Sequence, residues 1–355
     1  MRPFTYERAT SAEDALARHD GETHYLGGGT NLVDLMRLGV ETPARLVDVA
    51  HLPYDQIQLN PDGGLVIGAA VSNSALAADR TVREGHPMLA QAVLAGASGQ
   101  IRNLATVGGN LLQRTRCSYF QDAAKPCNKR NPGSGCPARE GEHHNLAILG
   151  HSEACVATHP SDMAVALAAL GASVSVLGRA GARTIPIDEF YRLPDNEPER
   201  DTVLEPGDLV TAVEVPPLGI PSRYRKVRER ASFAFALVSI AAALDVDGGV
   251  DSGAESGADG GEVRDVRLAL GGVAHKPWRA RRAEEALRGA PATRESFLRA
   301  AEAELEAAEP LRDNAYKVPL ARNLIVRTLT ELTESTQPEG TQPGGTAEPG
   351  EGTAS

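Results

Sequence analysis

Apolar residues in the first third of the chain alternate between strand-like and helix-like spacing. Short apolar runs bounded by turn residues are typical of strands, and apolar residues three or four apart are typical of helix faces. The sequence predicts strands at 23–26, 45–49 and 65–69, and helices at 12–17, 32–38, 72–78 and 88–96. Ser11 precedes the first of these helices and Asp14 lies in its first turn, which is the arrangement of an N-terminal cap.

The pattern continues through the centre of the chain and changes near residue 217. A helix is expected at 163–170, followed by strands at 172–177, 183–187 and 209–215. Pro216-Pro217 ends the last strand, and we place a domain boundary there. Beyond it, the sequence predicts strands at 224–228, 233–246 and 263–271, and helices at 280–289, 294–308 and 319–333.

Two stretches lack a hydrophobic pattern. Residues 248–262 (GGVDSGAESGADGGE) are expected to form a flexible acidic loop at a hairpin tip. Residues 334–355, rich in Pro, Gly, Thr and Glu, are expected to form a disordered tail. The sequence therefore predicts an α+β protein with one domain at 1–217 and a second at 218–333.

Charge and hydropathy narrow the range of partners. The 355 residues carry a formal net charge of −11, and this argues against nucleic acid as the main partner. No apolar run approaches the roughly 20 residues that span a bilayer, so no membrane insertion is expected. The first 20 residues contain no apolar signal region. We expect a cytoplasmic protein, or a periplasmic one only if a signal-bearing partner exports it.

A glycine loop follows the first predicted strand. Gly27-Gly28-Gly29-Thr30-Asn31 separates that strand from a helix, and backbone without side chains can approach a pyrophosphate closely. Asp48 follows at the distance typical of a Rossmann fingerprint, but the third glycine of that motif would fall on Leu32. We therefore interpret the loop as a pyrophosphate site of another kind, with an ordinary glycine turn as the alternative.

All the cysteines lie in one segment, at about 113–156. They are Cys117, Cys127, Cys136 and Cys155. Their spacing matches neither zinc fingers nor short ferredoxin motifs. Nearby basic residues would offset thiolate charge, namely Arg114, Arg116, Lys125, Lys129 and Arg130. The residues alone leave three possibilities open: an iron–sulfur cluster, structural zinc with help from His143, His144, His151 or His159, and unmetallated thiols.

Four short motifs occur along the chain in an order that indicates a known protein family. They are Leu26-Gly27-Gly28-Gly29-Thr30-Asn31-Leu32, Ala105-Thr106-Val107-Gly108-Gly109-Asn110, Pro160-Ser161-Asp162, and Leu270-Gly271-Gly272-Val273 with Pro277 and Arg279. Over about residues 1–331 the chain resembles the FAD-binding medium subunit of the molybdenum hydroxylases, the xanthine dehydrogenase and carbon monoxide dehydrogenase group. The stretch 113–155 resembles the branch that carries an extra 4Fe-4S cluster, which includes bacterial three-subunit aldehyde oxidoreductases.

The resemblance implies a set of cofactor-binding residues. The pyrophosphate of FAD would be wrapped by Leu26, Gly27, Gly28, Gly29, Thr30, Asn31, Leu32, Val33 and Asp34, with Thr106, Gly109 and Asn110 in a second flavin loop. Asp162 would hydrogen-bond the polar edge of the flavin or its ribityl chain, and Lys226 would stabilise negative charge on the reduced ring. Val215 would contact the adenine or the ring face. The alternatives are that Asp162 is simply an acid in the first turn of a helix, that Lys226 is a solvated lysine on a strand, and that Val215 packs as an ordinary strand residue.

The resemblance also implies a fold and a function. The fold is a PCMH-type FAD-binding domain of two α/β subdomains, then a C-terminal domain of a small antiparallel sheet plus helices. The four cysteines would hold the 4Fe-4S cluster. The protein would pass electrons from a small 2Fe-2S subunit through FAD to an external acceptor, and a large molybdenum-cofactor subunit would oxidise an aldehyde or a xanthine-like heterocycle. No catalytic residue is expected in this chain.

Two alternatives to that function remain at this point. One is the flavin subunit of a hydroxybenzoyl-CoA reductase-type enzyme, in which electrons run the other way. The other is a zinc-stapled nucleotide-binding assembly module without redox activity.

Overall fold

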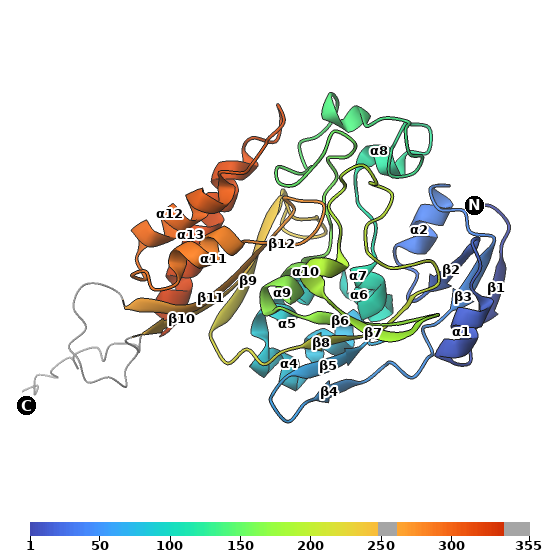
Figure 1. Cartoon of the computed structure of the whole chain (residues 1–355), viewed down its shortest axis with the longest axis horizontal. Coiled ribbons are helices and arrows are strands. Elements are labelled where there is room, and N and C mark those ends of the chain that lie inside the picture. Colours follow the sequence, from blue (N-terminus) through green and yellow to red (C-terminus); the bar gives the residue numbers. More distant parts are fainter. Residues whose placement is uncertain (248–260, 337–355) are drawn as a thin grey trace, which may run out of the picture.

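A computed structural model of the protein describes residues 1–247 and 261–336. It contains three sheets, with helices packed between and around them (Figure 1). Most of the expected acidic loop and tail lies outside the described residues. The parts that are described differ from the prediction, because Glu262 already begins a strand and the last helix continues to Thr336.

The N-terminal subdomain is a parallel sheet with its helices. Strands β1 (Thr5–Arg8), β3 (Arg45–Asp48) and β2 (Thr23–Leu26) lie in that order, and both pairs are parallel. Helices α1 (Ala12–Arg18) and α2 (Leu32–Arg37) complete it. Ser11 caps α1 as predicted, since its side chain accepts a hydrogen bond from the N–H of Asp14. The carboxyl end of β2 leads directly into the glycine loop.

The second subdomain is built on an antiparallel sheet of order β4-β5-β8-β6-β7. Its strands are β4 (Ile57–Leu59), β5 (Leu65–Gly68), β6 (Ser173–Gly178), β7 (Gly181–Pro186) and β8 (Leu209–Val215), and its main helices are α3 (Asn73–Ala78), α4 (Arg80–Gly85), α5 (Pro87–Ala95), α9 (Asp162–Leu170) and α10 (Ile187–Phe190). Every residue of α9 is buried. A helix that is apolar on all sides must be covered on all sides, and α9 packs against both this subdomain and the C-terminal sheet.

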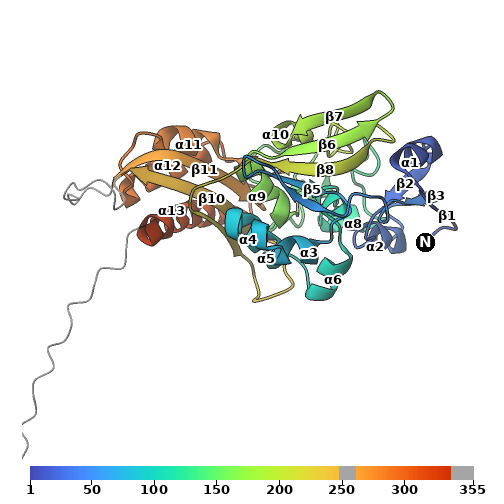
Figure 2. The ribbon, with the colours of Figure 1, turned by 90° about the horizontal axis from the view of Figure 1, so that it is seen from below.

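The C-terminal domain is a four-stranded antiparallel sheet of order β12-β11-β10-β9. Its elements are β9 (Ser222–Val227), β10 (Val238–Asp247), β11 (Glu262–Gly271), β12 (Trp278–Arg279), α11 (Arg281–Leu287), α12 (Arg294–Leu305) and α13 (Lys317–Thr336). Alternate residues of β10 face opposite cores, because Ile240 and Leu244 join the core beneath α11–α13, whereas Ala241 and Ala243 join the core around α9. Figure 1 shows the sheet with α11–α13 on one side and α9 on the other, and Figure 2 shows the same domain from below.

Several elements were not predicted. Strand β10 begins at Val238, so the expected strand at 233–237 is wrong, and Phe233 and Phe235 are exposed in a loop. Three short helices, α6 (Gly99–Leu104), α7 (Val107–Leu111) and α8 (Ser118–Gln121), follow α5, and the segment to residue 156 is mostly irregular. None of the described helices combines the length and the hydropathy needed to cross a bilayer.

Candidate functional site

The glycine loop after β2 presents a row of backbone donors. Among the described residues we find no acceptor for the N–H groups of Gly27, Gly28, Gly29, Thr30 and Asn31. Gly29 has a φ of +71°, a left-handed conformation that favours glycine. Successive N–H groups in such a turn form a concave anion site. The loop thus has the donors that a pyrophosphate needs.

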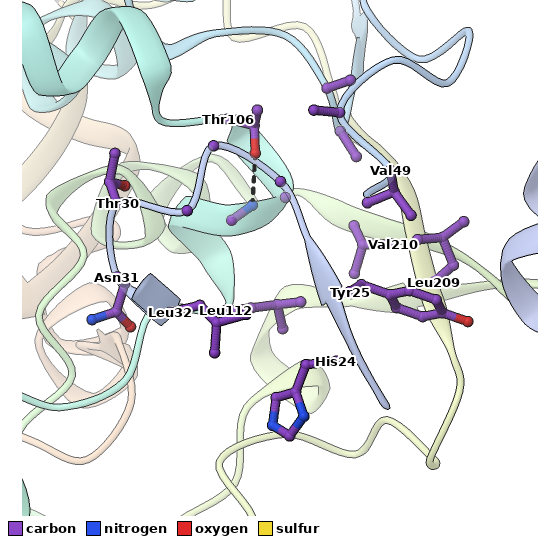
Figure 3. A pocket seen from close by; sticks show the side chains of 18 of the residues that line it. His24, Tyr25, Thr30, Asn31, Leu32, Val49, Thr106, Leu112, Leu209 and Val210 are labelled. Atoms are coloured by element: carbon purple, nitrogen blue, oxygen red, sulfur yellow. Dashed lines mark hydrogen bonds between the residues drawn. The ribbon is translucent and has the colours of Figure 1, made fainter. Parts of the chain in front are cut away.

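The second flavin loop, with Thr106, Gly109 and Asn110, supports the glycine loop and has few free N–H groups for a ligand. The N–H groups of Gly108 and Asn110 donate to Ala69 and Thr106 carbonyls, and that of Gly109 donates to the Thr106 hydroxyl at 3.2 Å (Figure 3). A Cβ atom on Gly28 would lie 1.8 Å from the carbonyl oxygen of Leu104, at the end of α6. The glycines at this junction therefore allow the two loops to touch each other.

Two cavities meet at the glycine loop. The first, which we name the β2 cavity, measures about 410 Å³ and lies between the two subdomains. Beyond the loop itself, its wall includes Tyr25, Leu32, Leu112, Leu209 and Val210, which Figure 3 shows around the cavity. This largely apolar wall suits a planar ring such as adenine.

The second cavity, the Lys226 cavity, measures about 550 Å³. Both cavities share the residues Gly29, Thr30, Asn31 and Gly109. Asp34 and Asn110 from the two loops, Asp162 at the start of α9 and Lys226 on β9 line only the second cavity. Sequence motifs that lie far apart along the chain are thus brought together around two adjoining cavities.

A buried ion pair closes one side of the Lys226 cavity. Nζ of Lys226 donates to Oδ2 of Asp162 at 2.7 Å and to the carbonyl of Ala95 at 3.2 Å. The two charged side chains are only 4% and 8% exposed. The hydroxyl of Tyr224 donates to Oδ1 of Asp162 at 2.5 Å, and burial, followed by the charge of Asp162, raises the pKa of Tyr224 well above its ordinary value. Lys226 is therefore a fixed cation, unlike the solvated lysine of the alternative interpretation.

One buried polar atom at the junction has no partner. Oδ1 of Asn31 accepts a hydrogen bond from the backbone N–H of Arg114 at 2.8 Å. Its Nδ2 atom is buried without a hydrogen-bond partner in the described part of the chain. An unpaired buried amide donor carries a free-energy cost that a ligand acceptor would remove. An FAD phosphate or ribityl oxygen fits this need.

Two predicted FAD-binding residues line neither cavity. Leu26 is the last residue of β2, and Val215 lies buried in the core at the end of β8. Other residues that line the cavities were not predicted, notably Arg116, Phe233 and Phe235 in the Lys226 cavity. The guanidinium of Arg116 lies 4.9 Å from the ring centroid of Phe235. In the sequence, Phe233 and Phe235 alternate with alanines, and this pattern was interpreted as a strand, so no local signal marked this rim.

The cysteines converge on a third, small cavity of about 10 Å³. Cys117, Cys127, Cys136 and Cys155 all line it. The backbone N–H of Ala157 donates to Sγ of Cys155 at 3.5 Å. However, within residues 1–247 and 261–336 no group of three or more His, Cys, Asp or Glu side chains is arranged to hold a metal ion. The donor set of four thiols nevertheless suits an iron–sulfur cluster.

Burial governs the acidity of these thiols. It raises the pKa of Cys117 to about 11 and that of Cys155 to about 12. Both groups therefore stay protonated at neutral pH unless a cation displaces the protons. Of the five basic residues near the cysteines in sequence, Lys129 lines this cavity, whereas Arg116 lines the Lys226 cavity. None of the four histidines named above lines it.

Comparisons with known proteins agree with this arrangement. Residues 2–218 match the family described as the FAD binding domain in molybdopterin dehydrogenase, and residues 222–332 match the CO dehydrogenase flavoprotein C-terminal domain. The aldehyde oxidoreductase FAD-binding subunit PaoB of Escherichia coli K12 is 48% identical over 336 residues, covering 93% of this chain and 98% of PaoB. The glyceraldehyde dehydrogenase medium chain of Sulfolobus acidocaldarius is 28% identical over 79% of this chain and 80% of its own length.

Solved structures share the fold. A chain of the CO dehydrogenase from Oligotropha carboxidovorans superposes with a TM-score of 0.71 at 22% identity, covering 94% of this chain and 99% of that chain. The expected α+β fold, with an FAD-binding domain and a C-terminal sheet domain, is confirmed. The chain therefore belongs to the FAD-binding medium subunits of the molybdenum hydroxylase family, and it is a subunit of an oxidoreductase.

Proposed function

We propose that this protein is the electron-transfer subunit of a heterotrimeric, molybdenum-dependent aldehyde oxidoreductase. The junction of the two cavities carries the proposal, since free amide donors lie where an apolar cavity meets a cavity with a fixed cation. A dinucleotide has the matching shape, with two ring systems joined by a pyrophosphate. Adenine would occupy the β2 cavity, and the flavin ring would occupy the Lys226 cavity.

The protein's own residues bind and tune the flavin. FAD, when bound, supplies the redox chemistry. The glycine-loop amides and Nδ2 of Asn31 would bind its phosphates, and the ammonium of Lys226 would favour negative charge on the ring. Asp162 and Tyr224 hold that ammonium in place. Because Lys226 and its partners are buried, this electrostatic effect is screened little by solvent.

The relatives support the wider assignment. PaoB is named an aldehyde oxidoreductase subunit, and other relatives are named medium chains. We infer an aldehyde as the substrate of the complex. We also infer a large subunit with the molybdenum cofactor and a small 2Fe-2S subunit as partners. Electrons would leave for an external acceptor.

We further infer that the four cysteines hold a 4Fe-4S cluster. The convergence of all four thiols on one cavity supports it, and so does the backbone N–H of Ala157, which is directed at Sγ of Cys155. Such N–H groups stabilise sulfur-borne negative charge in iron–sulfur proteins. The histidines that a mixed zinc site would use lie elsewhere.

A visible spectrum with metal analysis tests the proposal. Protein purified anaerobically with its native partners should show flavin bands on a broad iron–sulfur absorption, and a reductant should bleach both. Turnover of aldehydes by the same complex would favour the aldehyde oxidoreductase over the hydroxybenzoyl-CoA reductase alternative. Colourless, folded protein that contains zinc would instead establish the assembly module.

A further inference from the structure

One carboxylate links the glycine loop to the cysteine cavity. Asp201 lies in the loop between α10 and β8. Its Oδ2 atom is 2.7 Å from Nε of Arg114, and its Oδ1 atom accepts a hydrogen bond of 2.5 Å from Nζ of Lys129. The two cations belong to different sites, because Arg114 lines the β2 cavity and Lys129 lines the cysteine cavity.

Arg114 connects Asp201 to the flavin side. Its backbone N–H holds Oδ1 of Asn31, and this contact leaves the amide donor Nδ2 for a ligand. Its Nη1 atom donates to Oε1 of Glu41 at 2.8 Å. A guanidinium held by two carboxylates keeps one orientation, and these two contacts restrain the residue whose backbone N–H holds Asn31.

Lys129 connects Asp201 to the cysteine side. Its side chain is only 1% exposed, and Nζ also donates to the carbonyl of Pro198 at 2.6 Å. Lys129 follows Cys127 by two residues, so anchoring its ammonium also anchors that loop.

Asp201 is itself held in its charged form. Burial alone would raise its pKa, but Lys129, Arg114 and His275 outweigh that effect and hold the pKa of Asp201 well below its ordinary value. Nε2 of His275 lies 3.6 Å from Oδ1, and the opposite ring nitrogen donates to the carbonyl of Arg192. The carboxylate is therefore ionised at any pH at which the protein works.

We propose that Asp201 is a positioning residue that couples the FAD site to the cysteine site without touching either cofactor. The coupling rests on the proposed function, because it takes the glycine loop as the FAD site and the cysteines as the cluster site. Removing the charge of Asp201 would leave Lys129 buried without its partner and would release Arg114. Loss of a partner from a buried pair is strongly destabilising.

Three substitutions test separately the contact of Asp201 with Arg114 and its contact with Lys129. Asp201→Asn removes the ion pair with Arg114 and should weaken FAD binding roughly tenfold, and it should lower the iron content in the same protein. Arg114→Met should lower FAD occupancy with iron retained, and Lys129→Met should lower iron with FAD retained. If Asp201→Asn does not fold, Asp201→Glu still tests the link, because it shifts the carboxylate relative to both cations and should lower FAD and iron together.

Two controls exclude a general loss of stability. Asp188→Asn removes a similarly half-buried carboxylate that pairs with Arg281 and lines none of the three cavities, so both cofactors should stay. Asp201→Glu keeps the charge and should restore both cofactors in part. In Asp201→Asn molecules that retain iron, the reduction potential of the iron–sulfur centre should shift to a more positive value, because a nearby negative charge is gone.

The outcomes distinguish this inference from the proposed function. Wild-type protein with both cofactors, together with an Asp201→Asn variant of unchanged FAD affinity, iron content and potential, would overturn the coupling alone. Equal losses in Asp188→Asn would do the same. Wild-type protein that binds FAD but never iron would refute the proposed cluster and, with it, the coupling.

Discussion

Replacing Gly28 by alanine tests the contact between the two loops. The added Cβ would lie 1.8 Å from the carbonyl oxygen of Leu104 and 3.0 Å from Cα of Ala105, both of them backbone atoms. To restore even a 3.0 Å approach to that oxygen, the loops would have to separate by about 1.2 Å. Such overpacking costs about 1–3 kcal/mol of stability.

The same shift would displace the amide donors of the glycine loop. If two of their hydrogen bonds to phosphate are lost, at about 1.5 kcal/mol each, FAD affinity falls by about 100-fold. Gly21→Ala is the matched control, because nothing lies within 4 Å of its added Cβ.

The assay is a fluorescence titration of flavin-free protein with FAD, combined with urea unfolding of each variant. Gly28→Ala should lose both affinity and stability, and Gly21→Ala should lose neither. A folded Gly28→Ala variant with wild-type FAD affinity would refute the assigned role of this contact.

Three further substitutions probe the buried groups. Lys226→Met leaves Asp162 buried without its cation and should lower the free energy of unfolding by about 3 kcal/mol. Urea unfolding measures this loss, with Lys125→Met at an exposed position as the control. Equal stability of the two variants would be contrary evidence. Cys127→Ser should strip iron but leave most FAD bound, and unchanged iron per chain would reject the cluster. Burial lowers the pKa of Lys317 from 10.5 to about 7, so between those values the unfolded chain binds a proton that the folded chain lacks. Wild-type stability relative to Lys317→Met should therefore rise from about pH 7 to about pH 9.5, and a flat difference would contradict this.

Many of the regular elements were predicted from the sequence, although β1, β4, α4, α6, α7, α8, α10 and β12 were not. All the expected FAD-binding residues except Leu26 and Val215 line one of the two cavities. Strands β2 and β8 were predicted with their observed bounds, because β2 runs straight into the glycine loop and β8 is a Val-rich run ended by Pro216-Pro217. The motifs around Gly28, Thr106 and Asp162 do meet around the joined cavities. The sequence shows the order of these motifs along the chain. The parallel sheet of the N-terminal subdomain then places the glycine loop at the carboxyl end of strand β2.

Contacts between distant segments could not be predicted. A Cβ atom on Gly27 would meet Thr106, and one on Gly28 would meet the backbone just before the second loop. No local sequence pattern shows which segment will lie opposite these glycines. Asp201 gave no sign of its role, because it is a single acid in a polar stretch and its partners are 72 and 87 positions away. The loop at 233–237 was mistaken for strand because its apolar residues are compatible with either structure.

Binding of FAD at the cavity junction is the central claim, and a competition titration tests it most directly. Flavin-free, folded protein should take up one FAD per chain with a change in flavin fluorescence. ADP should displace the FAD, because it can occupy the β2 cavity and the amide donors by itself. Folded protein that fails to take up FAD, or FAD that ADP cannot displace, would contradict the assignment.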